Sequence, residues 1–109
     1  MDTNALCLPL AAIHALDDLQ DALREWSREK CPNQTPEGLA ALLSIHAEEL
    51  EEDILLENHD SAQEEAGDLL LVLLTLAGRE RFSLGFNLNL KLQESVRDTT
   101  RTVQEARHV

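Results

Sequence analysis

The chain has 109 residues, enough for one domain with a modest core, and its formal net charge of −12 argues against a nucleic-acid partner, because phosphate binding needs a basic surface. One Trp, two Phe and no Tyr predict an aliphatic core, and this composition, with four Gly and three Pro, favours an all-α fold. Two cysteines, no signal peptide and no apolar run of membrane-spanning length predict a cytoplasmic protein without a membrane partner.

The N-terminal part predicts a loose leader and one amphipathic helix. Residues 1–9 lead up to Pro9, and the helix is expected from Leu10 to Lys30. Its apolar residues recur at helical spacing: Leu10, Ile13, Leu16, Leu19, Leu23 and Trp26. We expect this helix to pack, with His14 at its surface or boundary.

The middle of the chain predicts a helical hairpin over about residues 36–77. Thr35 is the expected N-cap, with Pro36 in the first turn of a helix that extends to about Glu57. Ser61 followed by Glu64 matches a capping box, so the next helix is expected from Ser61 to about Ala77. The short connection predicts antiparallel neighbours.

Two carboxylate pairs lie on this hairpin, each three residues apart and therefore on one helix face. The first pair is Glu49 with Glu52, and the second is Glu65 with Asp68. No Lys or Arg occurs between Lys30 and Arg79 to compensate them. A divalent cation such as Mg²⁺, which takes carboxylate oxygens, would do so.

The faces of these pairs strengthen the metal hypothesis. The first pair interrupts an apolar stripe, so its carboxylates are expected to face a core. This stripe consists of Leu42, Ile45, Glu49, Glu52 and Leu56. The competing interpretation is a solvated acidic surface, which is the ordinary role expected for the other acids of the hairpin. Those acids are Glu48, Glu51, Asp53, Glu57 and Glu64.

The C-terminal half predicts oligomerisation and a fourth helix. A helix over the run from Leu69 to Ala77 would be apolar on almost every face, so it should be buried on more than one side. This favours a homodimer or a dimer of dimers. From Leu84 to Leu92 apolar and polar residues alternate as in a strand. A lone strand would have no partner, so we favour a helix from about Leu88 to Arg107 with Arg97 and Arg101 projecting together.

Three motifs, of which the one given last below lies upstream of the other two, resemble the MazG-like, all-α nucleoside triphosphate pyrophosphohydrolases. Glu48-Glu49-Leu50-Glu51-Glu52 is similar to the family's EExxE element, and Glu65-Ala66-Gly67-Asp68-Leu69-Leu70-Leu71 to its ELGDLL run. Lys30-Cys31-Pro32-Asn33-Gln34-Thr35 resembles its CPWDxxQT element with residues missing. The resemblance covers roughly residues 24–105.

The resemblance implies a single MazG-like helical domain over 1–109, a four-helix bundle completed by homo-oligomerisation. It implies hydrolysis of a nucleoside triphosphate to the monophosphate and pyrophosphate, with Mg²⁺, or Mn²⁺ as a substitute. The implied metal ligands are Glu49, Glu52, Glu65 and Asp68. Glu48 would support these ligands or act as the base for the attacking water.

For substrate binding, the resemblance leaves Lys91, Arg97 and Arg101 as candidates for phosphate contact and Trp26 as a candidate for stacking on the base. Phosphoryl displacement needs positioning and charge neutralisation rather than a Ser or Cys nucleophile. A house-cleaning role in nucleotide pools is what the resemblance suggests.

Two other function classes stay open. One is a non-catalytic helical interaction protein of the same fold that senses nucleotides or metal. The other is a ferritin-like di-metal bundle, in which a His follows a Glu by three residues on the same helix. Here His46 precedes Glu49, so we rank that class low.

Overall fold

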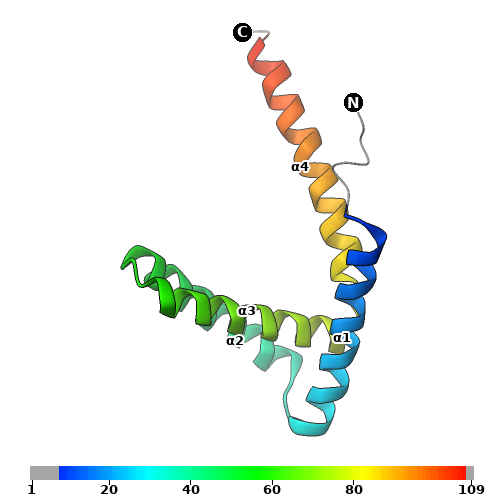
Figure 1. Ribbon diagram of the computed structural model, residues 1–109, viewed down its shortest axis with the longest axis vertical. Coiled ribbons are helices and arrows are strands. Elements are labelled where there is room, and N and C mark those ends of the chain that lie inside the picture. Colours follow the sequence, from blue (N-terminus) through cyan, green and yellow to red (C-terminus); the bar gives the residue numbers. More distant parts are fainter. Residues whose placement is uncertain (1–7, 108–109) are drawn as a thin grey trace. The chain divides into compact units, whose positions relative to one another are not determined.

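The computed structural model consists of four α-helices and contains no strand over the described part of the chain (Figure 1). It describes the backbone of residues 8–107 and the side chains of residues 8–95. The helices are α1 (Leu10–Lys30), α2 (Pro36–Leu55), α3 (His59–Glu80) and α4 (Leu84–Arg107). The all-α prediction is confirmed.

The expected start of α2 is confirmed by its cap. The Thr35 Oγ1 atom accepts a hydrogen bond from the Gly38 backbone N–H at 3.0 Å, and Pro36 occupies the first turn. The helix ends at Leu55, two residues earlier than expected, because Glu57 adopts a left-handed backbone with φ of 56°. A residue in that conformation cannot continue an α-helix.

The predicted Ser61 capping box is wrong. Helix α3 already begins at His59, and the Ser61 hydroxyl instead donates a 2.7 Å hydrogen bond to Asp53 Oδ2 on α2. Helix α3 also continues past Ala77 to Glu80 and ends at Arg81, whose φ of 58° is left-handed.

The strand alternative for residues 84–92 is also wrong. Helix α4 begins at Leu84, four residues before the expected start. The Ser83 hydroxyl oxygen accepts a 3.3 Å hydrogen bond from the Phe86 backbone N–H, as an N-cap does. This local cap outweighs the alternating pattern.

The chain forms two compact units. One comprises residues 18–82, and the other joins the chain up to Asp17 with the chain from Ser83 onward. Of the expected leader 1–9, residues 1–7 lie outside the described residues. A single domain over 1–109 stays a prediction.

Within residues 18–82, α2 and α3 lie side by side and antiparallel (Figure 1), as expected for the hairpin. Among the described residues of this unit, the buried apolar side chains are Leu39, Ala62, Val72, Leu74 and Ala77. The end of α3 approaches α1 closely at Gly78, where an added Cβ would collide with the Gln20 carbonyl oxygen. The Gln20 side-chain amide donates to the Phe82 carbonyl.

The other unit is held by similar contacts between α1 and α4. The Ser83 hydroxyl donates to Asp17 Oδ1 at 3.1 Å, and the Leu8 backbone N–H donates to Asn89 Oδ1 at 2.8 Å. An added Cβ at Gly85 would lie 2.8 Å from the Ile13 carbonyl oxygen, so the two backbones meet where only glycine fits.

Large apolar side chains remain exposed on the hairpin of a single chain. The predicted core-facing stripe of α2 is not buried in this chain: Ile45 is 48% exposed and Leu56 68%. In α3 the apolar run buries Val72 and Leu74 but leaves Leu70 53% exposed. No helix among the described residues combines the length and apolarity that a membrane crossing requires.

Candidate metal centre

The connection between α2 and α3 fixes which residues of the two helices face each other. The Asn58 backbone N–H donates to the Asp53 carbonyl at 2.8 Å, and Ser61 donates to the Asp53 carboxylate. These contacts hold the start of α3 against the end of α2. In an antiparallel pair anchored in this way, residues further along each helix meet in a fixed register.

At that register, one histidine and two glutamates come together. Nδ1 of His46 lies 3.0 Å from Glu65 Oε2 and 3.7 Å from Glu49 Oε2. One ligand atom from each of the three residues lies within 4.8 Å of the others. We call His46, Glu49 and Glu65 the acid–histidine cluster.

The cluster is partly shielded from solvent. The side chains of His46 and Glu65 are 20% and 18% exposed, whereas that of Glu49 is 48% exposed. Helix α2 supplies His46 and Glu49 one turn apart, and α3 supplies Glu65. The acid–histidine cluster is therefore open to solvent on the side of Glu49.

The charges in the cluster shift its proton affinities. Hydrogen bonding to Glu65 raises the pKa of the Glu49 carboxyl, and the negative charge of Glu65 and partial burial raise it further. The pKa of His46 is raised from its ordinary value of 6.5, first by the hydrogen bond to Glu65 and against the effect of burial. Both shifts favour the protonated form, because carboxylates crowd together.

This donor set suits a divalent cation. Two carboxylates from different helices offer oxygen ligands, and a cation between them would reduce the repulsion between their negative charges. The 3.0 Å contact of His46 with Glu65 fits a histidine that orients a ligating carboxylate. The imidazole nitrogen would also accommodate softer metals than Mg²⁺.

The other predicted metal ligands lie next to the cluster. Asp68 is exposed on α3, and its negative charge contributes to the raised pKa of His46. Glu52 is exposed on α2 and lines a shallow depression of about 320 Å³ together with Glu48, the predicted base. Glu52 is not among the three residues whose ligand atoms lie within 4.8 Å.

The predicted substrate-binding residues are spread over the helices. Trp26 on α1 is 46% exposed. Lys91 on α4 is exposed and forms a 3.0 Å ion pair with Glu94 of the same helix. Arg97 and Arg101 belong to α4, but their side chains lie outside the described residues.

His46 is the residue of the cluster that the sequence analysis did not assign to the metal site. The available signal was its spacing: His46 precedes Glu49 by three residues, so both lie on one face of α2. That face meets Glu65 only once the hairpin register is known.

Comparison with known proteins gives no relative to which this chain can be assigned. No protein-family model, curated protein sequence or solved structure matches it.

Proposed function

We propose that this chain is a Mg²⁺-dependent nucleoside triphosphate pyrophosphohydrolase that converts a ribo- or deoxynucleoside triphosphate and water to the monophosphate and pyrophosphate. The observation that carries the proposal is the meeting of Glu49 with Glu65 across the hairpin, 3.0 to 3.7 Å from one His46 nitrogen. The EExxE and ExxD motifs in the right order support it.

In this proposal Glu49, Glu52, Glu65 and Asp68 hold the cation. The bound cation would neutralise charge on the phosphoryl oxygens and make water a better nucleophile. His46 keeps Glu65 oriented through their hydrogen bond. Because His46 and Glu65 are mostly shielded, their orientation is less disturbed by solvent than that of an exposed pair.

Glu48 is the proposed proton acceptor. Its carboxylate would take a proton from the water that attacks the α-phosphorus, while the α–β phosphoanhydride bond breaks and pyrophosphate leaves. Glu48 and Glu52 line the same depression, so base and ligand share one solvent-accessible surface of α2. General bases of this kind contribute about 10²- to 10⁴-fold to rate.

A homo-oligomer is part of the proposal. The exposed leucines Leu70 and Leu71 on α3 and the exposed Ile45 on α2 supply an apolar surface that a second copy would cover. A dimer or a dimer of dimers would then bring further residues to the substrate. The role we propose is cytoplasmic removal of unwanted nucleotides.

The test is product analysis in ¹⁸O-labelled water with Mg²⁺ and a panel of ribo- and deoxynucleoside triphosphates. Attack at the α-phosphorus puts the label in the monophosphate and releases unlabelled pyrophosphate. Release of single phosphate, or label in the pyrophosphate, would contradict the proposed reaction. The matched control pair is Glu65→Gln, expected to be inactive, and Glu64→Gln, an equal charge change at the neighbouring exposed residue, expected to be active.

A second candidate is a non-catalytic sensor of nucleotides or metal with the same fold. The observation that favours it is the ion pair of Lys91 with Glu94. In an enzyme, the Lys91 ammonium group would be expected to contact substrate phosphate instead. Nucleotide binding without any product in the same assay would select this candidate. Iron-dependent oxygen consumption would instead select a di-metal oxidase.

A further inference from the structure

A second polar site lies in the unit of residues 18–82, away from the acid–histidine cluster. A depression of about 300 Å³ is lined by Arg24, Arg28, Arg79 and Arg81, together with Gln34 and Pro36. Glu80 also lines it, so four arginines against one glutamate give the lining a net charge of +3. We call this depression the arginine pocket.

The position of the pocket separates it from the proposed metal centre. Along α2, the distance from Pro36 to His46 is about 15 Å at about 1.5 Å per residue. Along α3, the distance from Glu65 to Arg79 is about 21 Å by the same rise. A single small ligand cannot touch both sites in one chain.

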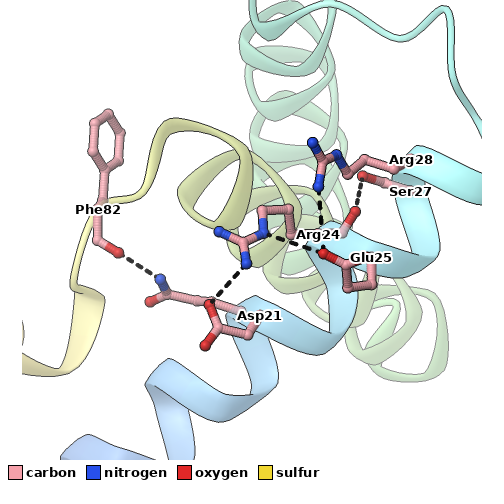
Figure 2. Close-up of polar contacts among 7 residues, drawn as sticks. Asp21, Arg24, Glu25, Ser27, Arg28 and Phe82 are labelled. Atoms are coloured by element: carbon pink, nitrogen blue, oxygen red, sulfur yellow. Dashed lines mark hydrogen bonds and ion pairs between the residues drawn. The ribbon is translucent and has the colours of Figure 1, made fainter.

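Two arginines of the pocket, Arg24 and Arg28, form only long ion pairs with their neighbours. Figure 2 shows Arg24 and Arg28 each joined by a dashed line to the Glu25 carboxylate. Arg28 Nη1 lies 3.5 Å from Glu25 Oε1, and Arg24 Nε lies 3.7 Å from the same oxygen. Charge-assisted hydrogen bonds are about 2.7–2.9 Å long. These ion pairs are therefore loose.

Arg24 also carries an unsatisfied donor. Its Nε atom is buried and has no hydrogen-bond acceptor among the residues that the structure describes. The Arg24 Nη2 atom lies 3.9 Å from Asp21 Oδ1, which is too far for a hydrogen bond. A buried N–H group without an acceptor is costly, and a bound oxygen ligand would remove that cost.

The backbone at Arg81 supports the same interpretation. Arg81 caps α3 in the left-handed conformation, where glycine is favoured because it has no Cβ. The chain nevertheless has an arginine at this position, and its side chain lines the pocket. Backbone strain of this kind is concentrated at functional sites. The adjacent N-terminus of α2, at Pro36, adds positive potential.

We propose that the arginine pocket binds a small phosphate-bearing anion without a metal ion. Planar guanidinium groups donate paired N–H bonds that match phosphoryl oxygens. A volume of about 300 Å³ is at the lower end for small-molecule sites, so the ligand is of the size of inorganic pyrophosphate or a single phosphorylated metabolite. This site does not depend on the metal centre being catalytic.

The test is calorimetric titration of the full chain with inorganic pyrophosphate in EDTA, which removes any role of divalent cations. We expect binding to wild type that weakens about tenfold or more in Arg28→Gln and in Arg81→Gly. Lys30→Gln is the matched control, because Lys30 is a nearby exposed cation that does not line the pocket. Titrations with inorganic phosphate and with a nucleoside monophosphate then distinguish the free anion from a phosphorylated metabolite.

Two features of the design separate binding from folding and from the metal centre. Arg81→Gly relieves the left-handed backbone, so its melting temperature should rise while anion binding falls. Glu49→Gln should leave anion binding in EDTA unchanged. The binding result can therefore be interpreted even if the chain proves not to hydrolyse nucleoside triphosphates.

Three outcomes would overturn the proposal. One is the absence of binding by all three probes in EDTA. Another is an equal loss of affinity in Lys30→Gln, which would indicate diffuse charge attraction. The third is a change in oligomeric mass on substitution of Arg28 or Arg81 with no change in anion affinity, which would make the pocket a docking surface for acidic residues of another copy.

Discussion

The acid–histidine cluster and the arginine pocket, both in the unit of residues 18–82, concentrate opposite charges. In one, carboxylate oxygens of Glu49 and Glu65 lie within 4.8 Å of each other, with His46 as their compensating group. In the other, four arginines line a depression with no ion pair shorter than 3.5 Å among the described residues. The first arrangement favours a cation and the second an anion. The placement of charges therefore indicates the ligands of each site, which the net charge of −12 does not.

The largest expected effect is loss of activity when a carboxylate of the metal centre is neutralised. Glu49→Gln or Asp68→Asn should lower Mg²⁺-dependent turnover by more than about a hundredfold, since even partners of metal ligands are worth about 10- to 100-fold. Without metal, Glu49→Gln should melt at a higher temperature, because carboxylate repulsion is removed. Full turnover of either variant would refute the ligand assignment.

The next effect concerns the packing that forms the arginine pocket. Gly78→Ala should lower the free energy of unfolding by about 1–3 kcal/mol, because the added Cβ collides with the Gln20 backbone. The matched control is Gly67→Ala in the same helix, where no atom lies within 4 Å of an added Cβ. That change should stabilise by about 0.5–1 kcal/mol. Chemical denaturation measures both, and equal effects would contradict the packing described.

A smaller loss in the free energy of unfolding is expected from a substitution at the start of α2. Thr35→Ala removes the side-chain acceptor of the Gly38 N–H and should cost about 1 kcal/mol. At the other end of the hairpin, Ser61→Ala removes the hydrogen bond to Asp53 at a cost of about 1 kcal/mol. Thr35 precedes Pro36, which lines the arginine pocket, whereas Ser61 lies at the other end of the hairpin. We therefore expect Thr35→Ala, but not Ser61→Ala, to weaken anion binding.

The smallest expected effect is a pH dependence of stability in EDTA. His46 binds its proton more tightly when folded, so its stabilising contribution is present below about pH 6.5 and is lost as pH rises through its raised pKa. Glu49, whose pKa is raised from 4.5, acts in the same direction at lower pH. Melting temperatures should therefore fall from about pH 6 to about pH 8.

The control for this pH effect is a pair of histidine variants. His46→Gln should flatten the decline, whereas His14→Gln, on the exposed part of α1, should leave it in place. A decline that is equally steep in both variants would mean that the His46–Glu65 pair does not carry it.

Local signals in the sequence were sufficient to predict four helices, the bounds of α1 and the start of α2. Thr35-Pro36 marks the start of α2, and the spacing of leucines marks α1 from Leu10 to Lys30. They were insufficient where competing hydrogen bonds decide, as at Ser61, whose hydroxyl bonds to Asp53 instead of capping its own helix. The start of α4 depended on the Ser83 cap, which the alternation from Leu84 concealed.

For the candidate site, helix periodicity predicted that Glu49 and Glu65 are candidate ligands. It could not predict which residues of α2 lie opposite which residues of α3. That register brings His46 to Glu65 across 19 residues of sequence. The arginine pocket is less accessible to sequence reasoning, because Arg24 and Arg79 lie on different helices and meet only through the close approach at Gly78. Such long-range juxtapositions have no short sequence pattern.

The most direct test of the metal centre is a Mn²⁺ titration followed by electron paramagnetic resonance, in which bound Mn²⁺ is lost from the signal of the free ion and Mg²⁺ competes for it. We predict tight binding to wild type and to Glu64→Gln, and loss of that binding in Glu65→Gln. Equal binding to all three proteins would mean that the acids of the hairpin are a solvated surface, and the proposed hydrolase centre would then be wrong.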